Sequence, residues 1–283
     1  MTAKEIASKA VILAAVSPAA LKLVGLLEQS EFANEEIVAV LKHDAVLTAK
    51  LLRVCNSPSL GLAETVGSID QAVLLLGYQQ ILRMVLALAL GDALAAPMPG
   101  YAVEAEELWN HSFVVAVAAE MMIHDSAGPV TDPATAFTAG LLHDVGKMAM
   151  NQVLTVPCQA AVRCRIAEHG ASRVEAEREV LGTDHAEVGA CLLTLWRLPE
   201  AIVEGVANHH APVIEPRGRL SPVVHLANCL AHLSGSAPGW ESYALKTDRR
   251  VAAAFELTPE KLEGLVLRLR ESCERSQSLI ATE

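Results

Sequence analysis

Apolar residues recur at intervals of three and four along the first part of this chain, which is the spacing of an amphipathic helix. The stretches 21–27 and 37–41 each carry such an apolar stripe. Pro18 and Asn34 are residue types that commonly begin helices, and we place helix starts at both. The beginning of the chain is therefore predicted to be helical.

A longer helix is predicted from the capping residue Ser68 to about Leu94, after a loop at 56–61 that is rich in Pro, Ser and Gly. The cluster 97–100, Pro-Met-Pro-Gly, cannot continue that helix, because proline lacks an amide donor and restricts the residue before it. We place a lobe boundary there. The predicted units are an N-terminal helical lobe (1–100), a histidine-rich helical lobe (101–235) and a C-terminal helical extension (236–283).

The remaining apolar stripes predict a further series of helices, each bounded by capping residues, proline or glycine. They cover 104–124, 133–150, 155–169, 171–182, 184–196, 199–210, 221–234 and 259–279. Aromatic residues make up only 4% of the chain, and its apolar content is mainly Ala, Leu and Val, which suits closely packed helices. The predicted fold class is all-α, a multi-helix bundle with an additional N-terminal helical lobe.

Charge and hydropathy narrow the function classes. Lys and Arg number 22 against 33 Asp and Glu, and the resulting net charge of −11 repels a nucleic-acid backbone. We expect no membrane span either, because the most apolar segment, 72–96, is interrupted by polar and charged residues (Gln79, Gln80, Arg83 and Asp92). The six cysteines form no CxxC pair, and the N-terminal segment has helical spacing rather than that of a leader peptide. We therefore expect a cytoplasmic protein.

Several histidines lie on otherwise apolar helices, and the first of them has an acidic neighbour. Glu107 and His111 are four residues apart, so their side chains share one face of a helix, with Cβ atoms roughly 5 to 6 Å apart. Two ligands could meet one ion there. An exposed Glu–His pair without a metal is the alternative.

A His-Asp pair, His143-Asp144, and a lysine, Lys147, interrupt an apolar helical segment. Burying these groups without partners would cost several kcal/mol. A divalent ion would compensate the imidazole and the carboxylate, which are ordinary ligands of zinc, iron and manganese. Lys147 would then contact an anionic group such as a phosphate.

His185 is predicted in the first turn of a helix, and His209-His210 at the end of another. A protonated histidine at a helix C-terminus is favourable by itself, so the pair has a structural alternative. Each histidine taken singly is compatible with a structural role. Their combination with the His-Asp pair favours a metal site of one or two divalent transition-metal ions.

In this order, the histidines and the His-Asp-x-Gly-Lys string resemble the signature of the HD superfamily, particularly HD-GYP phosphodiesterases and their HDOD relatives. The first lobe resembles the HDOD amino-terminal pattern in the strings 49–57 (AKLLRVCNS), 68–72 (SIDQA) and 75–77 (LLG). The string 198–200 (LPE), which leads to the histidine pair, also resembles this pattern. The resemblance covers roughly residues 15–235.

The resemblance implies a set of ligands. His111, His143 and Asp144 would form the site shared across HD proteins, and Asp144 with His185, His209 and His210 could hold a second ion. Glu107 fits the acidic position that precedes the first histidine in the phosphodiesterase branch. The family's usual fourth ligand is an aspartate, where this chain has Asn228. The amide oxygen of Asn228 can still coordinate a metal but brings no charge, so the affinity should be lower. His225 on the same helix face is a candidate substitute.

A second departure from the pattern follows the histidine pair, where the segment 211–218 has no Gly-Tyr-Pro element. We therefore expect no hydrolysis of cyclic dinucleotides. The leading hypothesis is a regulatory module that acts by binding a signalling protein, with a nucleotide as a further candidate ligand. The alternatives are a metal-dependent phosphohydrolase acting on a nucleotide, with Lys147 as its phosphate contact, and a helical scaffold whose histidines are merely hydrogen-bonded.

Overall fold

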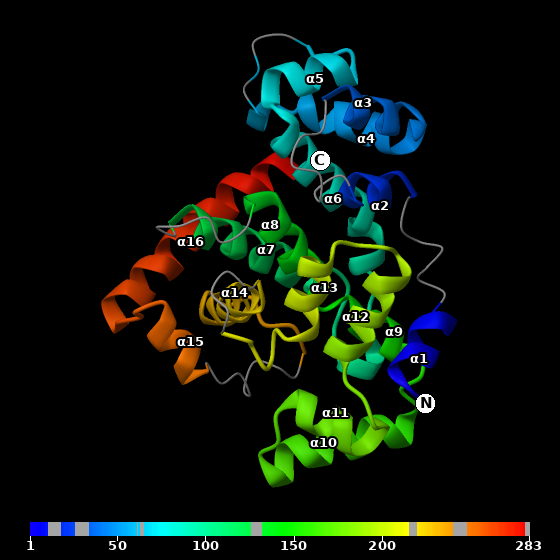
Figure 1. Ribbon diagram of the computed structural model, residues 1–283, viewed down its shortest axis with the longest axis vertical. Helices are drawn as coiled ribbons and strands as arrows, with labels where there is room; N and C mark the ends of the chain where they lie inside the picture. The colour runs from blue at the N-terminus through cyan, green and yellow to red at the C-terminus, as the bar shows by residue number, and fades with distance from the viewer. Residues whose placement is uncertain are drawn as a thin grey trace.

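The computed structural model describes residues 1–10, 18–25, 34–60, 62, 65–125, 132–214, 220–239 and 248–280. The first part of the chain forms α1 (Ala3–Lys9), α2 (Pro18–Gly25), α3 (Asn34–Lys42), α4 (Ala45–Cys55), the short 3-10 helix η3 (Pro58–Leu60), α5 (Ile69–Leu76) and α6 (Tyr78–Leu94). Helices α3, α4 and α5 gather at one end of the molecule, and α6 runs from them into the main body (Figure 1). The helix starts expected at Pro18 and Asn34 are those of α2 and α3.

The prediction of a single helix from Ser68 to about Leu94 is wrong, because the helix is interrupted at Gly77, which separates α5 from α6. Gly77 adopts a φ of 75°, a left-handed value that costs a residue without Cβ little. The apolar stripe runs through this position, so periodicity alone could not reveal the break. Ser68 does cap α5, by accepting a hydrogen bond from the backbone of Gln71.

After the 3-10 helix η4 (Pro99–Tyr101), the chain continues as helices of varied length. They are α7 (Glu107–Asp125), α8 (Pro133–Leu142), α9 (Val145–Asn151), α10 (Val156–His169), α11 (Arg173–Leu181), α12 (His185–Leu195), α13 (Glu200–Ala207), α14 (Ser221–Leu233), α15 (Arg249–Ala254) and α16 (Pro259–Ile280). The described residues contain no strand, only an isolated bridge between Met98 and Val103. The all-α prediction is confirmed.

Two further predicted helices end differently in the structure. The segment 133–150 is divided into α8 and α9 by His143 and Asp144, and α13 ends at Ala207, before the histidine pair predicted to close it. Both breaks place site residues at a helix end, and at Asp144 the backbone leaves the helical conformation, with φ −101° and ψ 7°. The chain at these points can therefore turn their side chains toward the interior.

The core of the larger body is built on α14, whose residues 221–231 are all buried. Helices α7 and α8 pack against it, and Gly140 of α8 lies so close to α7 that a Cβ there would be 2.8 Å from Cα of Ala116. The N-terminal helix α1 packs against α12 and α9 rather than joining α3 to α5. None of the described helices combines the length and apolar character that a membrane crossing requires.

Candidate metal centre

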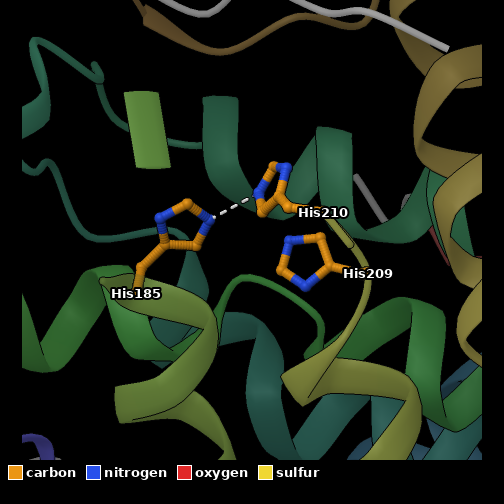
Figure 2. A group of neighbouring side chains, drawn as sticks. All are labelled: His185, His209 and His210. Carbon is orange, nitrogen blue, oxygen red and sulfur yellow. Dashed lines mark hydrogen bonds between the residues drawn. The ribbon is translucent and has the colours of Figure 1, made fainter. Parts of the chain in front are cut away.

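The candidate metal centre lies where four separate parts of the chain meet. His111 comes from α7, and His143 and Asp144 come from the turn between α8 and α9. The first residue of α12 is His185, and His209-His210 follow α13. Figure 2 shows the rings of His185, His209 and His210 facing one another across this junction.

Asp144 stands at the centre of this group, with imidazole nitrogens on both sides of its carboxylate. Its Oδ2 lies 3.3 Å from Nε2 of His143 and 3.8 Å from Nε2 of His111. Its Oδ1 lies 3.5 Å from Nε2 of His185 and 3.9 Å from Nε2 of His209. Nε2 of His185 is also 2.9 Å from Nε2 of His210 (Figure 2). One carboxylate therefore faces two sets of histidines.

The opposite nitrogen, Nδ1, of each of four histidines is held by an oxygen acceptor. A carbonyl or carboxylate oxygen can only accept, so each Nδ1 must carry the proton and leave Nε2 as a lone pair when the ring is neutral. These Nδ1 contacts are His111 to Ser236 O (2.8 Å), His143 to Gly140 O (2.8 Å), His209 to Val206 O (2.7 Å) and His185 to Glu177 Oε2 (2.7 Å). Outer hydrogen bonds of this kind orient histidines that ligate a metal.

The inward-facing atoms are buried without hydrogen-bond partners, which is the test of whether a cation fits. Among the described residues, Nε2 of His111, of His143 and of His209 and Oδ1 of Asp144 find no hydrogen-bond partner. Buried polar atoms without partners are costly, and lone pairs that face one another add repulsion. A divalent ion among them would satisfy these atoms together. The ligand atoms form two groups in which all lie within 4.8 Å of one another, namely His111 with His143 and Asp144, and His185 with His209 and His210.

Lys147 contacts the carboxylate rather than standing apart from it. Its Nζ donates to Oδ2 of Asp144 at 2.6 Å, and the whole side chain is buried. Burial alone would raise the pKa of Asp144, but the adjacent His143 and Lys147 hold it well below its usual value. Asp144 is therefore an anion in the folded protein.

Burial controls the protonation of most of the histidines. It lowers the pKa of His111, of His209 and of His210 well below the usual value, and neighbouring histidines add to the effect. His185 differs: burial acts to lower its pKa, but the carboxylate of Glu177 beside it produces a net rise. The neutral form, which is the form that binds a metal, is thus favoured at three of these positions.

Gly146 lets the two halves of the site approach. A Cβ at this position would lie 1.9 Å from the carbonyl oxygen of His185 and 2.6 Å from the amide nitrogen of Gly189, so α9 and α12 touch through their backbones. This contact brings Asp144, two residues before Gly146, to His185 at the start of α12. The glycine of the His-Asp-x-Gly-Lys string is required by this close approach.

Three other residues considered from the sequence are not among the six members of these two ligand groups. Oε2 of Glu107 accepts from the backbone N–H of Glu104 at 2.8 Å, and Glu107 is in neither ligand group. Both ring nitrogens of His225 contact backbone, Nδ1 at 2.7 Å from the His209 oxygen and Nε2 at 3.0 Å from the Asp248 nitrogen. Asn228 is buried on α14, and its Oδ1 has no hydrogen-bond partner in the part of the chain that the structure describes. The Gly-Tyr-Pro position extends into 215–218, outside the described residues.

Sequence reasoning missed two residues at the site. Glu177 of α11 is fully buried and accepts from both the backbone N–H and Nδ1–H of His185. His232 of α14 places its ring at 5.2 Å from that of His111 in an edge-on arrangement. The sequence does not reveal which acidic residue of α11 is buried. Glu175 and Glu179, two positions away on either side, are the same residue type as Glu177 and are exposed.

Comparison with known proteins finds the same domain by sequence. The model of the HDOD domain matches residues 13–212. A protein of uncharacterised function from Treponema pallidum (strain Nichols) is 24% identical over 220 residues, which covers 75% of this chain and 41% of that protein. The chain thus spans about two fifths of the length of this curated relative.

Two solved structures share the fold over nearly the full length. An HDOD domain protein of unknown function from Geobacter sulfurreducens is 26% identical, with a TM-score of 0.74 over 98% of this chain and 95% of the other. A protein from Shewanella amazonensis SB2B, provisionally called a phosphohydrolase, is 26% identical, with a TM-score of 0.68 over 94% of each chain. The likeness therefore extends beyond the residues that the domain model matches.

Proposed function

The chain belongs to the HDOD family, and on this premise we propose that it is a regulatory signal-transduction module whose buried metal site stabilises the fold instead of turning over a substrate. One observation carries the proposal. Of the six candidate ligands, His111, His143, His185 and His209 are 0% exposed, Asp144 is 1% exposed, and only His210 is partly exposed. Structural metal sites are closed by protein ligands, whereas catalytic sites keep a position open to water and substrate.

The ligand chemistry supports a transition metal, with iron, manganese and zinc as the candidates. Imidazole nitrogen and carboxylate oxygen suit all three ions. His111, His143 and Asp144 would hold one ion, and His185, His209 and His210, with the other oxygen of Asp144, would hold a second. When bound, such a cation supplies positive charge that satisfies the converging lone pairs. The expected partner is a signalling protein, with a nucleotide as the second candidate ligand.

The test combines metal analysis with unfolding measurements. Protein purified without chelator or metal-affinity steps should contain a divalent transition metal, and chelator treatment should lower its unfolding free energy. A ligand present at 100 times its dissociation constant stabilises the folded state by about 2.7 kcal/mol, so a loss of that order is expected. Elemental analysis that finds no metal, even after incubation with iron, manganese or zinc, would refute the metal site.

A metal-dependent phosphohydrolase acting on a nucleotide is the second candidate. It is favoured by the provisional description of the Shewanella relative and by an ammonium group, that of Lys147, within the ligand cluster. Cations and lysine could neutralise a phosphoryl group if the site opened. We expect no turnover of cyclic dinucleotides by the metal-loaded protein. Hydrolysis that disappears in His143→Ala protein would favour the enzyme over the regulatory module.

A further inference from the structure

Glu177 differs from the other groups that hold the site histidines because it is an acid. The Nδ1–H groups of His111, His143 and His209 donate to neutral backbone carbonyls, whereas that of His185 donates to a carboxylate. A carboxylate makes the histidine that it contacts a more basic ligand than a carbonyl does. Of the two ligand groups, the one that contains His185 therefore has an anionic hydrogen-bond partner outside the ligands themselves.

The contact fixes His185 in both position and ring orientation. Oε2 of Glu177 accepts from the backbone N–H of His185 at 3.0 Å and from its Nδ1–H at 2.7 Å. One oxygen therefore ties the ring to the first turn of α12, and the ring's other nitrogen is directed at His210 and Asp144. The side chain of His185 cannot rotate without losing the Nδ1 bond.

The buried guanidinium of Arg173 helps to keep Glu177 ionised in the interior. Nε of Arg173, one turn earlier on α11, lies 3.2 Å from Oε1 of Glu177, and both side chains are buried. The guanidinium of Arg173 also lies over the ring of Tyr101, with Cζ 4.3 Å from the ring centroid, so an aromatic ring covers one of its faces. An isolated buried carboxylate would cost several kcal/mol, and this arrangement offsets that cost.

We propose that Glu177 is a positioning residue for the group formed by His185, His209 and His210, and that its charge sets the metal affinity of this group without contacting the ion. The inference rests on the proposed metal site. It predicts an asymmetry between the two groups, because His111 and His143 have no such acid behind them. Removing the charge of Glu177 should weaken metal binding by the group that contains His185 and should not weaken binding by the group that contains His111.

The main variant is Glu177→Gln, which keeps the size of the side chain and one acceptor oxygen but removes the charge. Because this leaves Arg173 buried without its anion, a second variant, Arg173→Met with Glu177→Gln, removes both charges at similar volume. Glu179→Gln is the matched control: it lies on the same helix and is about half exposed, in a surface ion pair with Arg165. The three variants are compared with wild type in the full-length protein.

The measurement is competitive chelator titration of protein loaded with Co²⁺, followed by visible absorption. Loss of an outer-shell partner typically weakens metal binding about 10- to 100-fold. Both Glu177 variants should show this weakening for one ion only. His209→Ala and His111→Ala serve as references for the loss of each ion, and the absorption change in the Glu177 variants should match that of His209→Ala. Glu179→Gln should match wild type.

The outcomes separate this inference from the proposed function. Wild-type protein that binds no Co²⁺ would contradict the metal site itself. Wild-type binding with unchanged affinity in folded Glu177 variants would overturn the role of Glu177 alone. Equal weakening of both ions in both variants would also overturn it, because a general structural defect, and not positioning of His185, would then be the cause.

Discussion

Gly146→Ala should separate α9 from α12 and thereby dismantle the site without altering any ligand. The added Cβ would stand 1.9 Å from the carbonyl oxygen of His185 and 2.6 Å from the amide nitrogen of Gly189. Both atoms belong to backbone, so neither can move aside as a flexible side chain would. The helices themselves must shift.

The size of the shift follows from these contacts. Ordinary contact with a Cβ begins near 3.4 Å, so the His185 oxygen must retreat by about 1.5 Å (3.4 − 1.9). Overpacking costs typically about 1 to 3 kcal/mol and occasionally more, and a purely backbone clash belongs at the upper end. Metal–ligand distances tolerate only about 0.2 Å, so a cation shared by Asp144 and His185 should be lost as well.

Urea denaturation with and without chelator, together with elemental analysis, tests this reasoning. With a slope of roughly 3 kcal/mol per molar urea, a loss of about 3 kcal/mol lowers the midpoint by about 1 M. Gly91→Ala is the control, since no atom of the described residues beyond the local backbone of α6 lies within 4 Å of a Cβ at this position. This variant should stabilise the protein by about 0.5 to 1 kcal/mol. Wild-type stability and metal content in Gly146→Ala would refute the close approach.

Three further outcomes are expected. Asp144→Ala should lose more metal than any single histidine variant, because the carboxylate faces both ligand groups; equal losses in elemental analysis would contradict this. Asn228→Asp should raise metal retention in chelator competition for the His111 group only, because it restores an anionic oxygen on α14, and unchanged retention would place Asn228 outside the site. For protein whose metal has been removed with a chelator, a change from pH 7 to pH 5.5 should lower the unfolding free energy by at most about 4 kcal/mol. Histidines of the unfolded chain take up protons near pH 6.5, whereas burial keeps three histidines of the folded protein neutral. The stability that these three contribute is therefore present above pH 6.5 and lost below it. His185, whose pKa is raised, offsets part of the loss. A urea midpoint that does not fall between pH 7 and 5.5 would refute this prediction. The three histidines are His111, His209 and His210.

The fold class and the gathering of the site could be predicted because each depends on residue type and spacing. Apolar stripes gave the helices, and buried histidines beside an aspartate in apolar segments indicated groups that need a common partner. The structure brings together His111, His143 and Asp144, and likewise the later three histidines. Whether these groups hold metal stays a prediction.

The parts that could not be predicted depend on contacts between distant segments. Glu177 cannot be distinguished from Glu175 and Glu179 by spacing, because only the packing of α11 decides which of the three is buried. The break at His143 lies in a segment whose helical spacing of apolar residues resumes after the His-Asp pair, so the spacing does not reveal it. The close contact of Gly146 with α12 is visible only in the structure. His225 shares a helix with Asn228, but its ring is held by the backbone of two other segments.

The central position of Asp144 also means that the two ligand groups cannot be filled independently. An ion at either group would draw on the same negative charge and repel a second ion nearby, so the second should bind more weakly than the first. Such coupling is reciprocal: each ion lowers the affinity for the other by the same factor. Occupancy would then rise gradually over a broad range of metal concentration. The metal content of the protein would then change gradually, and not in a single step, as the concentration of free metal rises.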